Sequence, residues 1–387
     1  MPDYDGRPAA PTSAGDVALW VPRVVASPLY FTSEYLLRRP LGAITKGVEG
    51  ATEDDGPKSH WRYSPIVAAD LGFRPWFGLH VSNSHVFARN NATHAQAAFG
   101  GVHTLLLGLS DDVEVAHGTV LSLFGVITRR DDAIFHGFGP RSSPSDRTRF
   151  GYDRVEGGFG FVSALGPGSS FHAALGVRGT RFADPAEIAT RDYALTFQGA
   201  SLTLDTSDGS RPAATGIRVA VDGEHDLEVE RNHSARYVRW GGEATFSLDL
   251  TGKRRVLSLG IAARFVDSIA GEAPPVTEQV VLGGDRHLRG FLYGRLVGQS
   301  AAMIDLAYEW PIWVFLDGVL VAELGDVFGK HLDGLAPRLF RSSYTLGIRA
   351  TVTDATIELL GGLGTEPIAD GLRVSSGRLL LAITRPL

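Results

Sequence analysis

The stretch "GGDRHLRGFLYGR", residues 283–295, lies between two runs of alternating apolar residues and decides how the fold is read. It holds three arginines and four glycines in thirteen positions, so it is strongly charged and free to bend. A guanidinium stays protonated and can bind a carboxylate through two parallel hydrogen bonds. The partners expected for these arginines are therefore acids on the flanking strands.

Composition narrows the class of protein. The chain has 387 residues, of which 47 are glycine and none is cysteine, and its formal net charge is -6. Glycine exceeds its usual share of ~7 %, which favours sheets over helical bundles because glycine costs about 1 kcal/mol in a helix interior. The absence of cysteine excludes disulfides and thiolate metal sites. The net negative charge gives no electrostatic reason to bind nucleic acid, so that partner class is excluded.

No apolar run reaches the roughly 18 to 20 residues of a membrane-spanning helix. This length criterion does not apply to a transmembrane barrel, because its strands need only about 10 residues of alternating polarity. The N-terminal "MPDYDGRPAAPTSAGD" has neither the basic nor the apolar region of a signal peptide.

Apolar and polar residues alternate in runs from about residue 62 to the end of the chain. In "AAMIDLAYEW", residues 301–310, Ile304 and Leu306 fall on one face while Asp305 and Glu309 fall on the other. Several runs have the length of a membrane-crossing strand, and aromatic residues lie near their ends, as at a bilayer interface. The pattern favours a transmembrane antiparallel β-barrel, and a soluble domain of two stacked sheets remains the alternative.

The runs predict an all-β barrel of about 16 strands over residues 62–387. Fifteen runs are visible, two of them at 95–109 and 113–129, and bacterial barrels close with an even number of strands. The missing strand is expected within 41–50 or from a split of 62–87. Compact turns such as 251–254 are expected to face the periplasm. Four longer segments are expected to face outward: 131–148, 268–298, 327–340 and 364–375.

Residues 1–61 read as an N-terminal tail with a short helical segment at 16–40. Asp16 can cap a helix, and a rough apolar stripe follows it. The first interpretation is a helix packed on the barrel rim, and the alternatives are an interfacial helix or a plug in the lumen.

The loop and its neighbours resemble a known family. "LGGDRHLRGFLYGR" is similar to the sixth extracellular loop of the BamA/TamA superfamily of outer-membrane proteins, also called the bacterial surface antigen family. The family tetrapeptide corresponds to Leu288, Arg289, Gly290 and Phe291, and Gly-Arg follows it. The segments "AYEWPIW", "VLVAELGDVF" and "LDTSDGSRPAATG" resemble the family's strand and hairpin motifs. The likeness covers roughly residues 200–387 and implies a barrel in the outer membrane of a Gram-negative bacterium.

A loop lock follows from the alternation. Glu309 and Glu323 fall on the lumen faces of neighbouring strands, and the segment 268–298 is long enough to fold inside. Arg289 is predicted to bind both glutamates, with Gly290 allowing the turn and Phe291 packing it. The alternative is that Arg289 is a solvated loop charge.

The resemblance implies a role in inserting or translocating proteins at the outer membrane. Only about 60 residues precede the barrel, which is too short for a POTRA domain, so the sequence predicts a form without POTRA domains. Outer-membrane lipid and lipopolysaccharide are the expected surroundings, and a periplasmic partner protein or client outer-membrane proteins are the expected partners. A barrel-only channel or structural protein is the alternative function.

An enzymatic barrel is the third hypothesis. The sequence contains no nucleophile motif, no HExxH and no spaced metal set. Five histidines at 80, 85, 94, 103 and 117 are interpreted as wall or loop residues, with metal binding as the lesser alternative. The sequence therefore predicts no enzyme, no catalytic residue, no metal and no cofactor.

Overall fold

A computed structural model describes residues 61–84, 86, 90–207, 215–229, 235–313, 316–352 and 355–384. The helix expected at 16–40 and the strand considered at 41–50 lie outside these residues, as does most of the hairpin motif at 204–216. No helix among the described residues is long and apolar enough to cross a membrane.

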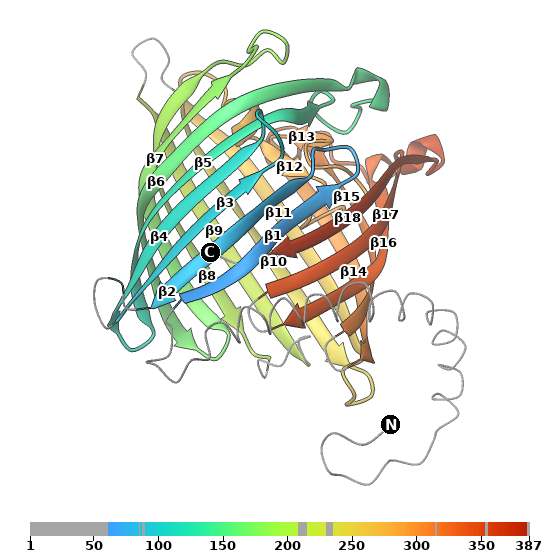
Figure 1. The fold of residues 1–387 in the computed structure, drawn as a ribbon. Coiled ribbons are helices and arrows are strands. Elements are labelled where there is room, and N and C mark those ends of the chain that lie inside the picture. The colour runs from blue at the N-terminus through green and yellow to red at the C-terminus, as the bar shows by residue number, and fades with distance from the viewer. Residues whose placement is uncertain are drawn as a thin grey trace. The chain divides into compact units, whose positions relative to one another are not determined.

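Sixteen antiparallel strands close into one barrel, in the order β1-β18-β17-β16-β15-β14-β11-β10-β9-β8-β7-β6-β5-β4-β3-β2 (Figure 1). The expected all-β barrel of 16 strands is confirmed. The barrel strands are β1 (Trp61–Asp70), β2 (Trp76–Ser84), β3 (Asn91–Phe99), β4 (Leu105–Ala116), β5 (Thr119–Phe135), β6 (Thr148–Gly166), β7 (Ser169–Phe182), β8 (Tyr193–Asp205), β9 (Gly216–Glu228), β10 (Arg236–Asp249), β11 (Val256–Ala270), β14 (Ser300–Trp313), β15 (Leu316–Phe328), β16 (Arg341–Val352), β17 (Ala355–Thr365) and β18 (Val374–Thr384). Two short strands, β12 (Val280–Leu282) and β13 (Leu296–Gly298), form a separate two-stranded sheet, and Val297 of β13 also bridges to Phe138.

The strand missing from the sequence pattern is one of the three between residues 91 and 135. The alternation predicted two strands there, at 95–109 and 113–129, whereas the structure has β3, β4 and β5. Only residues 117 and 118 separate β4 from β5, and Gly118 makes the turn at φ 71°. The run predicted at 113–129 spans this turn, and the run at 95–109 spans residues 100–104 between β3 and β4, so the predicted break at 110–112 falls inside β4.

The outer wall of the barrel is apolar. On β14, Ile304 and Leu306 are exposed on the outer face, while Asp305 lies over Gly260 of β11 inside. Neighbouring strands repeat this arrangement, as expected when lipid-facing and lumen-facing side chains alternate. Aromatic rings stack between neighbouring wall strands, with Trp240 of β10 on Phe265 of β11 at a centroid distance of 4.2 Å.

The seam between the first and last strands is the shortest barrel pairing. Among the described residues, β1 and β18 share four residue pairs, from Val67↔Ile383 to Asp70↔Leu380, whereas β10 and β11 stay in register from Tyr237 to Asp249. Residues 61–66 of β1 pair with β2, but with no described residue of β18. Because each pair contributes ladder hydrogen bonds, the seam has the weakest backbone pairing in the wall.

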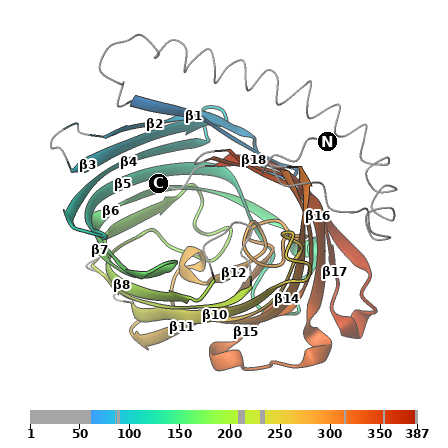
Figure 2. The ribbon, with the colours of Figure 1, turned by 90° about the horizontal axis from the view of Figure 1, so that it is seen from below.

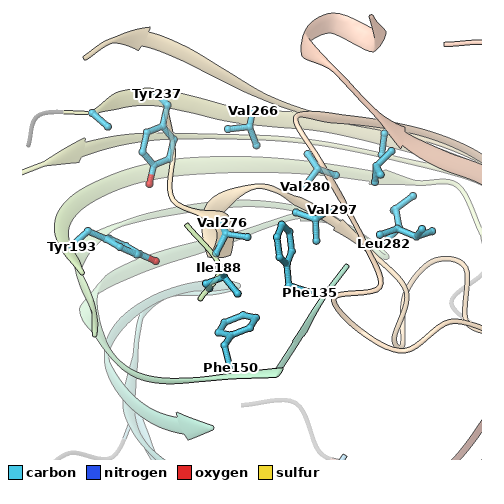
Figure 3. Close-up of a cluster of buried hydrophobic side chains, with 14 of the residues drawn as sticks. Phe135, Phe150, Ile188, Tyr193, Tyr237, Val266, Val276, Val280, Leu282 and Val297 are labelled. Carbon is cyan, nitrogen blue, oxygen red and sulfur yellow. The ribbon is translucent and has the colours of Figure 1, made fainter. Parts of the chain in front are cut away.

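The connection between β11 and β14, residues 271–299, lies inside the barrel. We call it the inward loop, and Figure 2 shows its strand β12 within the ring of wall strands. Leu288, Phe291 and Leu296 of this loop are fully buried. They belong to one cluster with wall residues that include Phe150 and Tyr237; Figure 3 shows part of this cluster. Burial of each large apolar side chain contributes roughly 1.5–3 kcal/mol, so packing alone favours the loop's place in the lumen.

Candidate functional site

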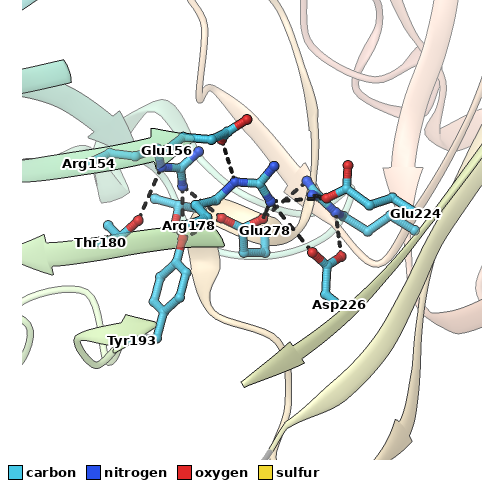
Figure 4. A network of polar contacts seen from close by, with 10 residues as sticks. Arg154, Glu156, Arg178, Thr180, Tyr193, Glu224, Asp226 and Glu278 are labelled. Carbon is cyan, nitrogen blue, oxygen red and sulfur yellow. Dashed lines mark hydrogen bonds and ion pairs between the residues drawn. The ribbon is translucent and has the colours of Figure 1, made fainter. Parts of the chain in front are cut away.

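The first anchor of the inward loop is Glu278, at the end of a 3₁₀ turn formed by Val276–Glu278. Its carboxylate is completely buried and meets three guanidinium groups of the wall (Figure 4). The N–O distances are 2.8 Å to Arg154, 3.0 Å to Arg178 and 3.1 Å to Arg239. The hydroxyl of Tyr193 also donates to it. These partners come from β6, β7, β10 and β8, so one loop residue joins four strands.

The charges around Glu278 decide its ionisation. Burial would raise the pKa of this carboxyl, but the three arginines outweigh burial and the net pKa lies below its usual value. Wall acids share the arginines: Arg178 donates to Glu156 at 2.6 Å and Arg239 to Asp226 at 3.0 Å. A buried carboxylate with this many charge-assisted hydrogen bonds is held in one place.

Sequence reasoning missed the Glu278 anchor. Residues 154, 178 and 239 are inward positions of strands that the alternation did locate, and a buried position opposite them in the loop could have been sought. The prediction instead placed the anchor at Arg289, because this residue belongs to the family tetrapeptide. The loop side chain that forms this anchor is a carboxylate, whereas the prediction expected an arginine of the loop.

The second anchor is the tetrapeptide at residues 288–291, which we call the loop tip. The backbone N–H of Arg289 donates to Glu323 of β15 at 2.6 Å, and the hydroxyl of Ser343 on β16 donates to the same carboxylate at 2.7 Å. The N–H of Gly290 donates to the Ser343 hydroxyl at 2.8 Å. The structure thus brings Glu323 to the predicted arginine, but through the main chain.

The guanidinium of Arg289 does not make the predicted bidentate contact. Among the described residues, no carboxylate oxygen lies within 4.0 Å of its nitrogens, and its buried Nε has no hydrogen-bond partner. Its charge acts over a longer range on Glu323 and on Asp305. Asp305 is the residue of β14 that stands opposite Glu323 in the register.

Glu309 lies elsewhere, which corrects the predicted pair. It stands opposite Val319 and four residues along β14 from Asp305, or about 13 Å at the usual rise per residue. Its carboxylate binds Arg349 of β16 at 3.2 Å. Glu309 and Glu323 both face the lumen, as the alternation predicted. Alternation alone does not fix which residues of two neighbouring strands stand opposite each other.

Gly290 serves close approach instead of a turn. A Cβ at this position would lie 2.2 Å from the carbonyl oxygen of Leu363 on β17. The positive φ in the tetrapeptide belongs to Leu288, at 51°. Phe291 lies over Gly364, where a Cβ would come within 2.5 Å of the ring. The loop tip therefore packs closely against the glycine-rich segment 361–364 of β17.

A third contact joins the inward loop to the seam. Arg378 of β18 is buried, and its Nε donates to Asp70 of β1 at 2.9 Å. Its other nitrogens donate to the carbonyl oxygen of Gly284 and to the carboxylate of Asp285, both at 2.5 Å and both in the loop. We call these contacts the seam latch, because one guanidinium holds the first strand, the last strand and the loop.

The histidines considered as metal ligands form no such site in the described part of the chain. No group of three or more His, Cys, Asp or Glu residues is placed to hold a metal ion there. The rings of His80 and His94 lie 5.5 Å apart, and His94 is 3.8 Å from Asp112. His85 is outside the described residues.

A closed 16-strand antiparallel β-barrel with an inward loop defines the fold class of the described residues. No protein-family model matches the chain, and no curated protein matches it by sequence.

The fold of the chain is similar to that of several solved structures. The chain is similar to BamA from Haemophilus ducreyi lacking POTRA domains 1–3, with a TM-score of 0.64 and 9 % identity over 86 % of this chain and 74 % of that chain. It is similar to CdiB from Escherichia coli, with a TM-score of 0.57 and 14 % identity over 88 % and 70 %. For CdiB from Acinetobacter baumannii the TM-score is 0.56 and the identity 13 %, over 84 % of this chain and 59 % of that chain.

Proposed function

We propose that this chain is a barrel of the bacterial outer membrane that inserts or translocates proteins by opening the seam between β1 and β18. The proposal also takes lipid and lipopolysaccharide as its surroundings, and a periplasmic protein or client outer-membrane proteins as its partners. It includes no enzymatic step and no cofactor.

One observation carries the proposal, namely the short seam. Four residue pairs hold β1 to β18, and residues 61–66 of β1 pair with no described residue of β18. Breaking so few pairs costs less than opening the wall anywhere else, since a net backbone hydrogen bond contributes only about 0.5–1.5 kcal/mol. A lateral opening at this place would expose a strand edge on which a client strand could pair.

The seam latch supports a role for the inward loop as the control of that opening. Arg378 cannot keep its contacts with both Asp70 and Asp285 if β1 moves away from β18. Opening therefore requires the latch to break. Because the loop is held independently at Glu278, it can stay in the lumen while the seam moves.

A disulfide across the seam tests the proposal. Ala68 and Ala382 are paired in register, and the chain has no native cysteine, so the double variant Ala68→Cys, Ala382→Cys can be oxidised without competing thiols. The protein is reconstituted into liposomes, and a urea-denatured eight-stranded outer-membrane barrel is added as the client. Its folding is followed by the gel-mobility shift between folded and unfolded forms.

We expect the unmodified protein to speed client folding, the oxidised seam variant to lose this effect, and reductant to restore it. The matched control is Ala173→Cys, Ala200→Cys, an in-register alanine pair between β7 and β8, which should keep full activity when oxidised. Acceleration that persists with the seam locked would contradict opening at this place.

A barrel-only channel or structural protein is the other outcome. The buried loop fills part of the lumen, which disfavours a wide permanent pore. Stable single-channel currents in planar bilayers, together with no effect on client folding, would favour the channel.

A further inference from the structure

A charged cavity lies where three connections of the barrel meet, at the end that carries the inward loop. Its volume is about 830 Å³, and its walls come from the β5–β6, β15–β16 and β17–β18 connections. Cavities of roughly 300–1,000 Å³ hold ligands the size of a small organic molecule. The space is therefore large enough for more than a single small ion.

Arginines dominate the lining of this cavity. Arg141, Arg338 and Arg373 are exposed, each from a different connection, and none has a carboxylate oxygen within 4.0 Å among the described residues. A fourth, Arg341, is buried and is neutralised by Asp326. Two acids also line the cavity: Glu366, which lies 3.9 Å from Arg341, and the exposed Asp370. Four arginines therefore face two acids, and Arg141, Arg338 and Arg373 form no ion pair within 4.0 Å with a described residue.

A further buried cation lies beside the cavity. Arg295 of the inward loop is buried and donates to the hydroxyl of Ser142 at 2.9 Å and to its carbonyl oxygen at 3.0 Å. Arg341 donates to the same carbonyl at 3.1 Å. Burial, and after it the charge of Arg341, lower the pKa of Arg295 to about 10, so it stays protonated at neutral pH. Two guanidinium groups therefore fix Ser142, which lines the cavity.

The chemistry of this lining selects among anions. Guanidinium groups bind phosphate oxygens through paired N–H donors, and several of them converge well on an anion that carries more than one negative charge. An anion in the cavity would also relieve the repulsion among the arginines, whereas an apolar or cationic ligand would not. The volume leaves room for a sugar next to the phosphate.

We propose that this cavity binds a phosphate-bearing saccharide anion, with Arg338 and Arg373 as its principal ligands. The chemistry is shared by two sources, a phosphorylated lipid headgroup of the outer leaflet and a soluble sugar phosphate. The lipid source rests on the proposed outer-membrane location, whereas binding of the anion itself does not depend on protein insertion.

The test measures binding to the purified full chain in phosphate-free detergent micelles. Glucose 1,6-bisphosphate is titrated by calorimetry at two salt concentrations, with glucose as the uncharged probe. In a second arm, native lipopolysaccharide and chemically dephosphorylated lipopolysaccharide are compared in co-purification. The variants are Arg338→Gln and Arg373→Gln, and the matched control is Lys253→Gln, an exposed cation in the turn between β10 and β11.

We expect the bisphosphate to bind with an affinity that falls as salt rises, and glucose not to bind. Each arginine variant should weaken binding about tenfold, because each removes one charge-assisted contact, and Lys253→Gln should change nothing. Retention of native but not dephosphorylated lipopolysaccharide, lost in the same two variants, identifies the lipid as the source. Retention of neither, with the soluble probe still bound, identifies the soluble sugar phosphate.

Two results would overturn the proposal. One is that neither phosphate-bearing probe binds to the unmodified protein. The other is that both arginine variants, shown to be folded by their gel mobility, bind the bisphosphate as tightly as the unmodified protein does. Client-folding assays play no part in this test, so its failure is separate from failure of the proposed function.

Discussion

The inward loop is held at two places by opposite means. At Glu278 a loop carboxylate is surrounded by three wall arginines, and the side-chain charge makes the contact. At the loop tip the cationic side chain of Arg289 binds no carboxylate among the described residues, and the main chain makes the contact with Glu323. One anchor depends on charge and the other on the absence of a side chain at Gly290.

This difference shows what the tetrapeptide does in this chain. Its glycine lets the main chain approach β17, and its phenylalanine packs against Gly364, so shape explains both positions. The electrostatic anchor lies ten residues earlier, outside the motif. A motif can therefore mark the position of a loop correctly while the charge that holds the loop lies elsewhere.

The largest expected effect is that of Glu278→Gln. Removing one member of a buried ion network leaves the remaining charges uncompensated, which typically costs about 3–5 kcal/mol. We expect the free energy of unfolding to fall by that amount in urea titrations in detergent micelles. The control is Glu272→Gln in the same loop, whose half-exposed carboxylate binds Arg191 at 3.2 Å. That change should cost less than about 1 kcal/mol, and equal effects of the two variants would contradict a special role for Glu278.

The second-largest expected effect is that of Gly290→Ala. The new Cβ would lie 2.2 Å from the carbonyl oxygen of Leu363, and a backbone atom of the wall cannot move aside easily. We expect a loss of about 1–3 kcal/mol and a loop tip that becomes sensitive to protease. Gly179→Ala is the matched control, because nothing lies within 4 Å of its Cβ. A tip that stays resistant in the Gly290 variant would argue against close approach as the reason for this glycine.

A smaller effect concerns pH, through His136 in the β5–β6 connection and His287 in the inward loop. Burial lowers the pKa of His136 and of His287 to about 4, with neighbouring arginines adding to the shift. The unfolded chain binds these protons near pH 6.5 while the folded chain does not, so stability falls as the pH drops from about 6.5 to 4. We expect a loss of about 1 kcal/mol per histidine by pH 5.5.

The variant His136→Asn, His287→Asn should flatten this pH dependence, measured as unfolding free energy between pH 7.5 and 5.0. His103→Asn, an exposed position between β3 and β4, should leave the slope unchanged. Glu278 does not contribute in this window, because a carboxyl with a lowered pKa loses its stabilising charge only at more acidic pH. An unchanged slope in the double variant would assign the acid sensitivity to other groups.

Alternation predicted the barrel and fifteen runs, because polarity changes with every residue of a wall strand, and the even strand number of bacterial barrels raised the expected count to about 16. It missed the boundaries on both sides of β4, at residues 100–104 and 117–118. It also paired Glu309 with Glu323, since register between strands is set by turn geometry and not by polarity. Glu278 could not be found this way, because burial of a loop residue depends on where the loop folds.

Amide hydrogen exchange over residues 280–297 tests the central claim most directly. Glu278→Gln should speed exchange in this segment at least about tenfold, as expected for a loss of more than 1.4 kcal/mol of local stability. Arg289→Gln, which keeps the N–H that Glu323 accepts, should leave exchange close to that of the unmodified protein. Fast exchange in Arg289→Gln with full protection in Glu278→Gln would contradict the account.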